Sequence, residues 1–528
     1  MENPLQLNQN KVSKKLRFKI NKIFIKYIIH FYRLPAMLCS AIILTIFHSS
    51  KWFSKFVPKA QVLILCHILG GLKNKMAGYR YLIIAILIIT SMLNQSFIPS
   101  WPTPVNSEEI KLVKNTANAT GVDGKVLPRT IIIDPQGLVK MKQLVVMKQN
   151  DSIVQDFLKK IITEADSVLV KRPLSVTEKT EIPPNGTKHD YFALADYEWP
   201  NPNTPDGLPY VSRDGHINPE TLLIKDKSYI EEMVNRVMIL AIAGYFTDNP
   251  KYNLKAEELL RVWFLDNDTY MEPSIKYGDF ERGHGRLNPS GIMGAHHLPY
   301  LVDAIGMLEL SPKWNNSVRE GLELWFSKYL DWLLNSDLGK LEGQRKNNHG
   351  TYYAAQISAI AFFLNKPDLT KQLLKSTMQD LSNARLEDVS RLISVKINPD
   401  GTQPFEIRRA NSLHYHIWNL YGLVLLARIG DQVGVDLWNY EIHGTGIRKA
   451  LDFIVPYTLG NQTWPYSQIK RLNIEDLSFL QGIVCQAILH YDSQSYMQVY
   501  SYLDRQNLPL NFQDTICNLH IKYIDTGS

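Results

Sequence analysis

The chain has 528 residues, of which 45% are hydrophobic and 21% charged, as is usual for a globular protein that forms its core without metals or a disulfide framework. Its net charge of +7 is concentrated in residues 1–80, which hold 14 lysines and arginines and one acidic residue, Glu2. The rest of the chain therefore carries a net charge of −6. Nucleic acid is not expected as a partner of this body, because phosphate binding requires a basic surface.

The N-terminal region predicts membrane targeting. An apolar run over 82–93 follows Lys73, Lys75 and Arg80. A full membrane span needs about 20 residues, so the shorter run predicts either a cleaved signal peptide or a signal anchor over 76–98. Residues 1–75 form a basic segment with further apolar stretches, and either add membrane segments or lie upstream of a start at Met76. The positive flank predicts a body that is secreted, or held on the lumenal or extracellular side of the membrane by this one segment.

Two features bear on the compartment of the body. Cys485 and Cys517 are either a disulfide, if the body is lumenal, or two buried free thiols, and we prefer the thiols. None of the four cysteines has the spacing of a zinc site. Asn-x-Ser/Thr sequons predict a glycoprotein, and they occur at Asn94, Asn118, Asn150, Asn185, Asn267, Asn315 and Asn461.

The body is predicted to be all-α. Residues 99–139 are rich in proline and glycine and read as a linker. Helical periodicity then predicts helices over 229–246, 252–264, 317–334, 351–363, 369–392, 411–429, 447–457 and 477–491. Several are joined by short connections, as in helical hairpins that close into an arc or toroid. The long irregular stretches 183–219 and 272–299 are expected to be functional loops.

Three polar segments stand out within this helical pattern. The first begins at Lys188 and reads KHDY, followed by WPNPNTPDGLPY from Trp199; the second, NNHGTYY, begins at Asn347; the third, DGTQPFEIRR, begins at Asp400 and is followed by His414 and Tyr415. In this order the segments resemble the three signature stretches of the alginate lyase superfamily. The resemblance covers about 140–525, and it implies an α/α toroid that cleaves mannuronate-type linkages by β-elimination.

The residue types in these segments suit that chemistry. β-Elimination removes the C5 proton beside a uronate carboxylate and expels the C4 oxygen, so the carboxylate charge must be neutralised. Asn348, His349 and Arg409 supply an amide, an imidazole and a permanent cation. Tyr415 is the candidate base, acid or both, and His349 is the competing base. A phenolate would need a nearby cation, which Arg409 could provide.

The resemblance also implies a substrate-binding set and leaves one assignment open. In some family members the arginine precedes the tyrosine by seven residues, which would select Arg408 instead of Arg409. The substrate-binding residues are expected to be Lys188, His189, Tyr191, Trp199, Asn347, Tyr353 and Arg408. We expect no cofactor and no metal, because the proposed site is built from an amide, an imidazole, a guanidinium and a phenol. The family implies an acidic polysaccharide as substrate, and we expect a monomer.

Other interpretations remain open. Asn347 could be a helix N-cap with Asn348 and His349 filling the first turn, and Tyr415 could be a core aromatic. The protein could then be an inactive, lyase-like carbohydrate-binding surface protein. A hydrolase would need paired carboxylates, but Asp400 and Glu406 form no compelling pair because Asp400 precedes a glycine and reads as a turn. The histidines at 284, 296 and 297 lack further metal ligands at helical spacing.

Overall fold

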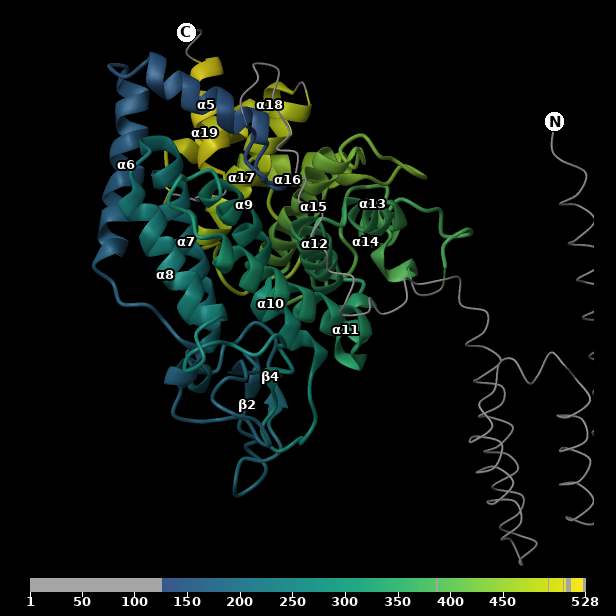
Figure 1. Cartoon of the computed structure of the whole chain (residues 1–528). Helices are drawn as coiled ribbons and strands as arrows, with labels where there is room; N and C mark the ends of the chain where they lie inside the picture. Colours follow the sequence, from purple (N-terminus) through teal and green to yellow (C-terminus); the bar gives the residue numbers. More distant parts are fainter. Residues whose placement is uncertain (1–125, 386–387, 492, 507, 510–513, 526–528) are drawn as a thin grey trace, which may run out of the picture. The chain divides into compact units, whose positions relative to one another are not determined.

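The computed structural model describes residues 126–385, 388–491, 493–506, 508–509 and 514–525 (Figure 1). The basic segment predicted over 1–75 and the signal segment predicted over 76–98 lie outside these residues, as does most of the linker predicted over 99–139. Within the described ranges, no helix combines the length and the apolar character needed to span a membrane.

The described body is mainly helical, which confirms the predicted all-α class. Its helices are α5 (Pro135–Met147), α6 (Ser152–Leu169), α7 (Asp226–Thr247), α8 (Pro250–Phe264), α9 (Leu298–Leu308), α10 (Asn316–Asn335), α11 (Asp337–Gly343), α12 (Asn348–Phe363), α13 (Pro367–Ser376), α14 (Ile393–Lys396), α15 (Ser412–Val433), α16 (Ile447–Thr458), α17 (Ile474–His490), α18 (Gln494–Asp504) and α19 (Thr515–Asp525). Short 3₁₀ turns are η2 (Val176–Glu178), η3 (Pro219–Leu223), η4 (Pro289–Ala295) and η5 (Val389–Arg391).

Seven of the eight helices predicted from periodicity are present, but the helix predicted over 369–392 is wrong. Helix α13 ends at Ser376, where the hydroxyls of Ser376 and Thr377 donate to the carbonyls of Leu373 and Leu374 at 2.6 and 2.7 Å. Hydroxyl groups that bond their own backbone compete with helix continuation. The chain then turns before resuming in η5 and α14.

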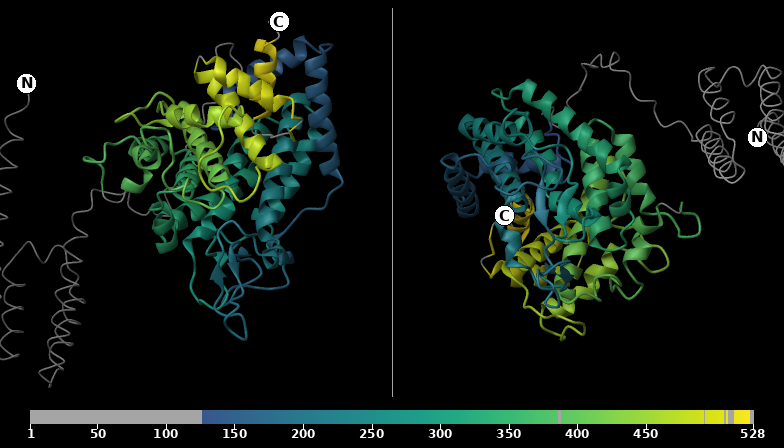
Figure 2. Two further views of the ribbon diagram at one scale, coloured as in Figure 1. Left: turned by 180° about the vertical axis from the view of Figure 1, so that it is seen from behind. Right: turned by 90° about the horizontal axis from the view of Figure 1, so that it is seen from below.

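Neighbouring helices contact one another in a closed series. Helix α7 packs on α9, α9 on α12, α12 on α15 and α15 on α17. Helix α17 then packs on α19, which contacts α5 and α6, and α6 returns to α7. The view from below in Figure 2 shows this curved arrangement, with α6–α8 in blue and teal, α12–α15 in green and the C-terminal helices in yellow.

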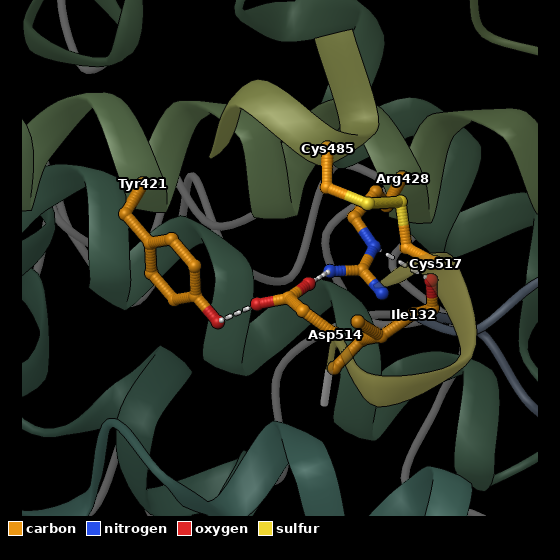
Figure 3. Close-up of a disulfide and its surroundings, with 6 residues drawn as sticks. All are labelled: Ile132, Tyr421, Arg428, Cys485, Asp514 and Cys517. Carbon is orange, nitrogen blue, oxygen red and sulfur yellow. Dashed lines mark hydrogen bonds and ion pairs between the residues drawn. A yellow bond between two sulfur atoms is a disulfide. The ribbon is translucent and has the colours of Figure 1, made fainter. Parts of the chain in front are cut away.

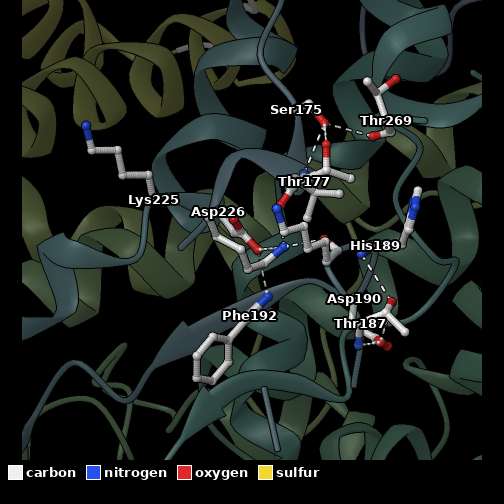
Figure 4. A network of polar contacts seen from close by, with 12 residues as sticks. Ser175, Thr177, Thr187, His189, Asp190, Phe192, Lys225, Asp226 and Thr269 are labelled. Atoms are coloured by element: carbon white, nitrogen blue, oxygen red, sulfur yellow. Dashed lines mark hydrogen bonds and ion pairs between the residues drawn. The ribbon is translucent and has the colours of Figure 1, made fainter. Parts of the chain in front are cut away.

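The two long loops lie together at one end of the helices (Figure 1). In them, β1 (Phe192–Leu194) pairs in parallel with β4 (Tyr277–Phe280), and β2 (Glu198–Trp199) pairs antiparallel with β3 (Val211–Ser212). The ammonium group of Lys179 holds the first loop in place, since it pairs with Asp226 at 2.9 Å and donates to the carbonyl of Lys188 at 2.6 Å. Figure 4 shows this network, in which Asp226 also accepts the N–H of Phe192.

A disulfide joins the C-terminal helices α17 and α19 to each other, and a buried ion pair joins the segment before α19 to α15 (Figure 3). Cys485 of α17 and Cys517 of α19 form a disulfide with Cα atoms 6.1 Å apart, so the preferred prediction of free thiols is wrong. The packing of α17 on α19 brings the two backbones within bonding range. Beside them, Arg428 pairs with Asp514 at 2.7 Å and donates to the carbonyl of Ile132 at 2.9 Å.

The last part of the predicted linker belongs to the core. Ile131, Ile132 and Ile133 are almost fully buried, and their N–H groups donate to the carboxylate of Asp303 in α9 at 2.6–3.1 Å. Helix α5 follows at Pro135, capped by Asp134. The folded body therefore begins before residue 140, where the resemblance placed its start.

Candidate active site

The second motif forms the N-terminus of α12, where a carboxylate from the third motif caps the helix. The carboxylate of Glu406 accepts the backbone N–H of Asn348 at 2.7 Å and its side-chain N–H at 2.9 Å. The side chain of Asn347 makes no capping bond, so its interpretation as a simple N-cap is wrong. Gly350 is required here, because a Cβ at this position would lie 1.9 Å from the carbonyl oxygen of Arg345.

His349 is held by a buried carboxylate. Its Nδ1 lies 2.6 Å from Oε1 of Glu342, whose side chain is 1% exposed, whereas the His349 side chain is 21% exposed. Burial alone would lower the pKa of His349, but the charge and hydrogen bond of Glu342 outweigh it and raise that pKa. An ionised carboxylate only accepts hydrogen bonds, so Nδ1 carries the proton and Nε2 of the neutral ring keeps its lone pair.

Asp279 on β4 is a second titratable group beside His349. Its pKa is raised to about 7, mainly by burial, and the positive charge of His349 acts in the opposite direction. The charge on each of these two side chains therefore influences the protonation of the other.

Arg409 and Tyr415 meet as the resemblance implied. Nη2 of Arg409 donates to the hydroxyl of Tyr415 at 2.7 Å, and the guanidinium lies 3.7 Å from the centre of the tyrosine ring. Arg408 is exposed and lies over the ring of Phe405. The structure thus brings Arg409, not Arg408, to Tyr415 and selects the six-residue spacing.

Two residues of the first long loop complete this contact. The carboxylate of Asp214 accepts from Nε of Arg409 at 3.1 Å and from Nη2 at 2.5 Å. The hydroxyl of Tyr197 lies 2.6 Å from that of Tyr415. Burial and the neighbouring Tyr197 raise the pKa of Tyr415, although Arg409 opposes the shift. The phenol of Tyr415 is therefore protonated at neutral pH and can act as a proton donor.

Glu406 connects the two halves of the cluster. It is 1% exposed, binds Asn348 directly and interacts electrostatically with Arg409. Burial raises the pKa of Glu406, while the hydrogen bonds from Asn348 and the nearby charges of Arg409 and Lys396 oppose the shift. Asn348, Glu406, Arg409 and Tyr415 thus form one connected polar cluster at the facing ends of α12 and α15.

Five of the seven residues predicted to bind substrate are exposed or half-buried. Lys188 and Arg408 are exposed, whereas His189, Trp199 and Asn347 are half-buried. The indole of Trp199 donates to the carbonyl of His216 at 2.7 Å, and its ring lies 5.1 Å from the guanidinium of Arg213.

Tyr191 and Tyr353 need correction. Their side chains are 1% and 2% exposed and pack in the hydrophobic core. The hydroxyl of Tyr353 donates to the carbonyl of Leu333 at 2.7 Å. We reassign both tyrosines to the core, because they pack among its hydrophobic side chains.

Several site residues were missed by the sequence analysis. They are Tyr197, Asp214, Asp279, Glu342 and Lys396. Tyr197 and Asp214 lie in a loop whose unusual length marked it as functional, and Asp279 lies in the other. Glu342 and Lys396 carried no sequence signal. No group of three or more metal-ligating side chains occurs in the described part of the chain.

Comparisons with known proteins agree with the motifs. The family model for alginate lyase matches residues 175–464, which include all three motifs. The crystal structure of an alginate lyase from Bacteroides ovatus is 29% identical, covering 74% of this chain and 98% of its own, with a TM-score of 0.65. Alginate lyase A1-III from Sphingomonas species A1 is 16% identical, with coverages of 70% and 92% and a TM-score of 0.44. No curated protein matches the chain.

Proposed function

Because this chain belongs to the alginate lyase family and is a polysaccharide lyase, we propose that it cleaves a uronic-acid polymer of the alginate type by β-elimination. The observation that carries the proposal is the contact of Arg409 with the hydroxyl of Tyr415, in one cluster with Asn348. A cation and an amide can stabilise the charge on the substrate carboxylate, and a protonated phenol can donate to the leaving oxygen. The closed series of helical contacts supports the α/α toroid that the family resemblance implies.

The first requirement is neutralisation of the substrate carboxylate. The C5 proton becomes acidic only when the negative charge that develops on the carboxylate is stabilised. Arg409 provides a permanent cation whose side chain is 22% exposed, and Asn348 provides a fixed amide. Asp214 holds the guanidinium side-on through Nε and Nη2, which leaves Nη1 for the substrate.

The second requirement is a base for the C5 proton. We assign this role to neutral His349, because Glu342 fixes the proton on Nδ1 and raises the basicity of the ring. A base with a pKa near the working pH combines proton affinity with availability of the free form. The two electrons of the C5–H bond form the C4–C5 double bond as the C4–O4 bond breaks.

The third requirement is an acid for the leaving oxygen. Tyr415 carries its proton at neutral pH and donates it to O4, while Arg409 stabilises the phenolate that forms. After product release, the hydroxyl of Tyr197, 2.6 Å away, can relay a proton from water to Tyr415, and His349 releases the C5 proton to water. Protons and electrons balance without an oxidant or a cofactor.

Product analysis tests this proposal. The protein is incubated with polymannuronate, polyguluronate and polyglucuronate, and the ultraviolet absorbance of the unsaturated uronate is followed. The matched control is each polymer with its carboxylates reduced to alcohols, which removes the acidity of the C5 proton. We expect absorbance with at least one polyuronate and none with the reduced polymers. New reducing ends without absorbance would indicate hydrolysis, and binding without cleavage would favour the inactive carbohydrate-binding alternative.

We also propose that the body is secreted or held on the lumenal or extracellular side of a membrane. The disulfide between Cys485 and Cys517 is typical of an oxidising compartment. The sequons in the described part of the chain, at Asn150, Asn185, Asn267, Asn315 and Asn461, are all exposed. Enzymatic deglycosylation should therefore increase gel mobility, and intact vesicles should protect the body from protease. An unchanged mobility together with cleavage from the cytosolic side would contradict this topology.

A further inference from the structure

A buried carboxylate and a buried ammonium group lie on either side of the peptide that joins Asn347 to Asn348. Glu406 and Lys396 are 1% and 2% exposed. Glu406 binds the two N–H groups of Asn348. Nζ of Lys396, at the end of α14, donates to the carbonyl oxygens of Lys346 and Asn347 at 3.3 and 3.2 Å.

The bonds to Glu406 do more than cap α12. Elsewhere in the described body, α5, α6, α8 and α10 are capped by the aspartate or asparagine that directly precedes each helix. Helix α12 also has an asparagine there, but its side chain makes no capping bond. A carboxylate 58 residues further along the chain binds instead, and its second oxygen binds the amide of Asn348, which the helix does not need.

This second bond determines how the Asn348 amide is oriented. An amide can be turned over, which exchanges its donor and acceptor ends at almost no change in shape. An ionised carboxylate accepts only, so Oε2 of Glu406 fixes the nitrogen end toward itself. Lys396 favours the ionised form of Glu406 by its charge. By donating to the carbonyl oxygens of Lys346 and Asn347, Lys396 holds the two peptide groups before Asn348 in place.

We propose that Glu406 and Lys396 are positioning residues, which fix the amide of Asn348 so that its second N–H can donate to the substrate carboxylate. The inference rests on the proposed function. Neither residue needs to touch the substrate, and both act through Asn348. A misplacement of a catalytic group by about 1 Å can lower turnover roughly 100-fold, so loss of either residue should reduce kcat more than it changes KM.

The first test is Glu406→Gln. The substitution keeps the shape of the side chain but replaces one of its two accepting oxygens, Oε1 or Oε2, by an NH₂ group that only donates. We expect kcat to fall about 10- to 100-fold, with KM within about threefold. The matched control is Asp303→Asn, because Asp303 is also fully buried and binds backbone N–H groups, but of the segment 131–133. The control should lower the melting temperature and leave kcat per folded molecule unchanged. An unchanged kcat in folded Glu406→Gln would overturn the proposal.

The second test is a double-mutant cycle with Asn348→Ala, since residues that act through one another are not additive. If Glu406 acts only through Asn348, then Glu406→Gln should change kcat less than twofold in the Asn348→Ala background. A full additional loss in the double variant would overturn the proposal, because Glu406 would then act independently. Complete absence of turnover in the wild-type protein would instead refute the proposed function, so the two failures are distinguishable.

Lys396→Met keeps the test decisive if Glu406→Gln does not fold. The methionine retains the apolar stem and removes only the ammonium group. We expect kcat to fall about tenfold, again with little effect in the Asn348→Ala background. A folded Lys396→Met variant with wild-type kcat would show that the pair serves stability alone.

Discussion

Helix α15 carries a polar network at each end, and the two networks use the same residue types differently. Near its N-terminus, Tyr415 bonds Arg409, which pairs with Asp214. Further along, Tyr421 bonds Asp514, which pairs with Arg428. The side chains of Arg409 and Asp214 are 22% and 40% exposed, whereas those of Arg428 and Asp514 are 6% and 0% exposed. The first network can still bind a ligand, and the second is closed.

The difference in side-chain exposure distinguishes the proposed active site from a network that stabilises the fold. Arg428 pairs with Asp514 and donates to the carbonyl of Ile132. The negative charge of Asp303 also stabilises the charged form of Arg428. Its pKa is raised because these partners outweigh its burial. Through these contacts Arg428 holds the C-terminal segment and the segment around Ile132 against α15. Changes at the closed end should therefore alter stability, and changes at the open end should alter turnover.

The largest expected effect on stability is at the closed end. Asp514→Asn leaves the charge of Arg428 buried without its carboxylate, and breaking a buried ion pair in this way costs about 3–5 kcal/mol. We expect the free energy of unfolding, measured by urea denaturation, to fall by that amount. Turnover per folded molecule should stay at the wild-type level. Lost turnover with wild-type stability would show that the two ends of α15 are not separate.

Removal of the disulfide should have the next largest effect. Replacing both Cys485 and Cys517 by serine releases a loop of sequence separation 32, and such a crosslink contributes about 2–4 kcal/mol. The melting temperature should fall, and kcat measured below the transition should not change. Adding a thiol reductant to the wild-type protein should lower its melting temperature similarly. A double variant as stable as the wild type would refute the structural role of this crosslink.

A pH profile tests the assignment of His349 as the base. The pKa of His349 is raised by Glu342 against the effect of burial, and the base form predominates only above that pKa. The ratio kcat/KM should therefore rise with pH through it, by about tenfold per unit on the acid side. Glu342→Gln removes the negative charge, so the acid limb should move to lower pH. An acid limb that stays in place would remove His349 from the role of base.

The smallest expected effect is that of metal chelation. The groups assigned to the reaction are an amide, an imidazole, a guanidinium and a phenol, which supply the charge and the protons themselves. We expect dialysis against EDTA to leave kcat within about twofold of its starting value, since no assigned step of general acid–base catalysis depends on a metal. Complete loss that a divalent cation restores would contradict this mechanism.

The comparison also shows what could be predicted from the sequence. The periodicity of α7 and α15 identified these helices, because long helices with many apolar positions depend little on distant contacts. Asn348, His349, Arg409 and Tyr415 were identified because they lie in compact motifs. From the sequence, Glu406 was considered as a possible carboxylate partner of Asp400, although the structure binds it to Asn348.

Residues that contribute through distant contacts could not be predicted. Tyr197 meets Tyr415 across 218 positions and Asp214 meets Arg409 across 195. Lys396 reads as an ordinary surface lysine in the sequence, and only the packing of α14 against the start of α12 buries it. The disulfide likewise depends on how α17 and α19 pack, which no local pattern encodes.

The central claim is that the open end of α15 serves chemistry, and Tyr415→Phe tests it most directly. The substitution removes one hydroxyl and keeps the ring, so turnover and melting temperature are measured on the same sample with a polyuronate that the wild type cleaves. We predict turnover lower by about 10² or more, as expected for loss of a general acid, with a melting temperature close to that of the wild type. Near wild-type turnover, or a variant destabilised by about 1–3 kcal/mol whose folded fraction remains active, would contradict the account.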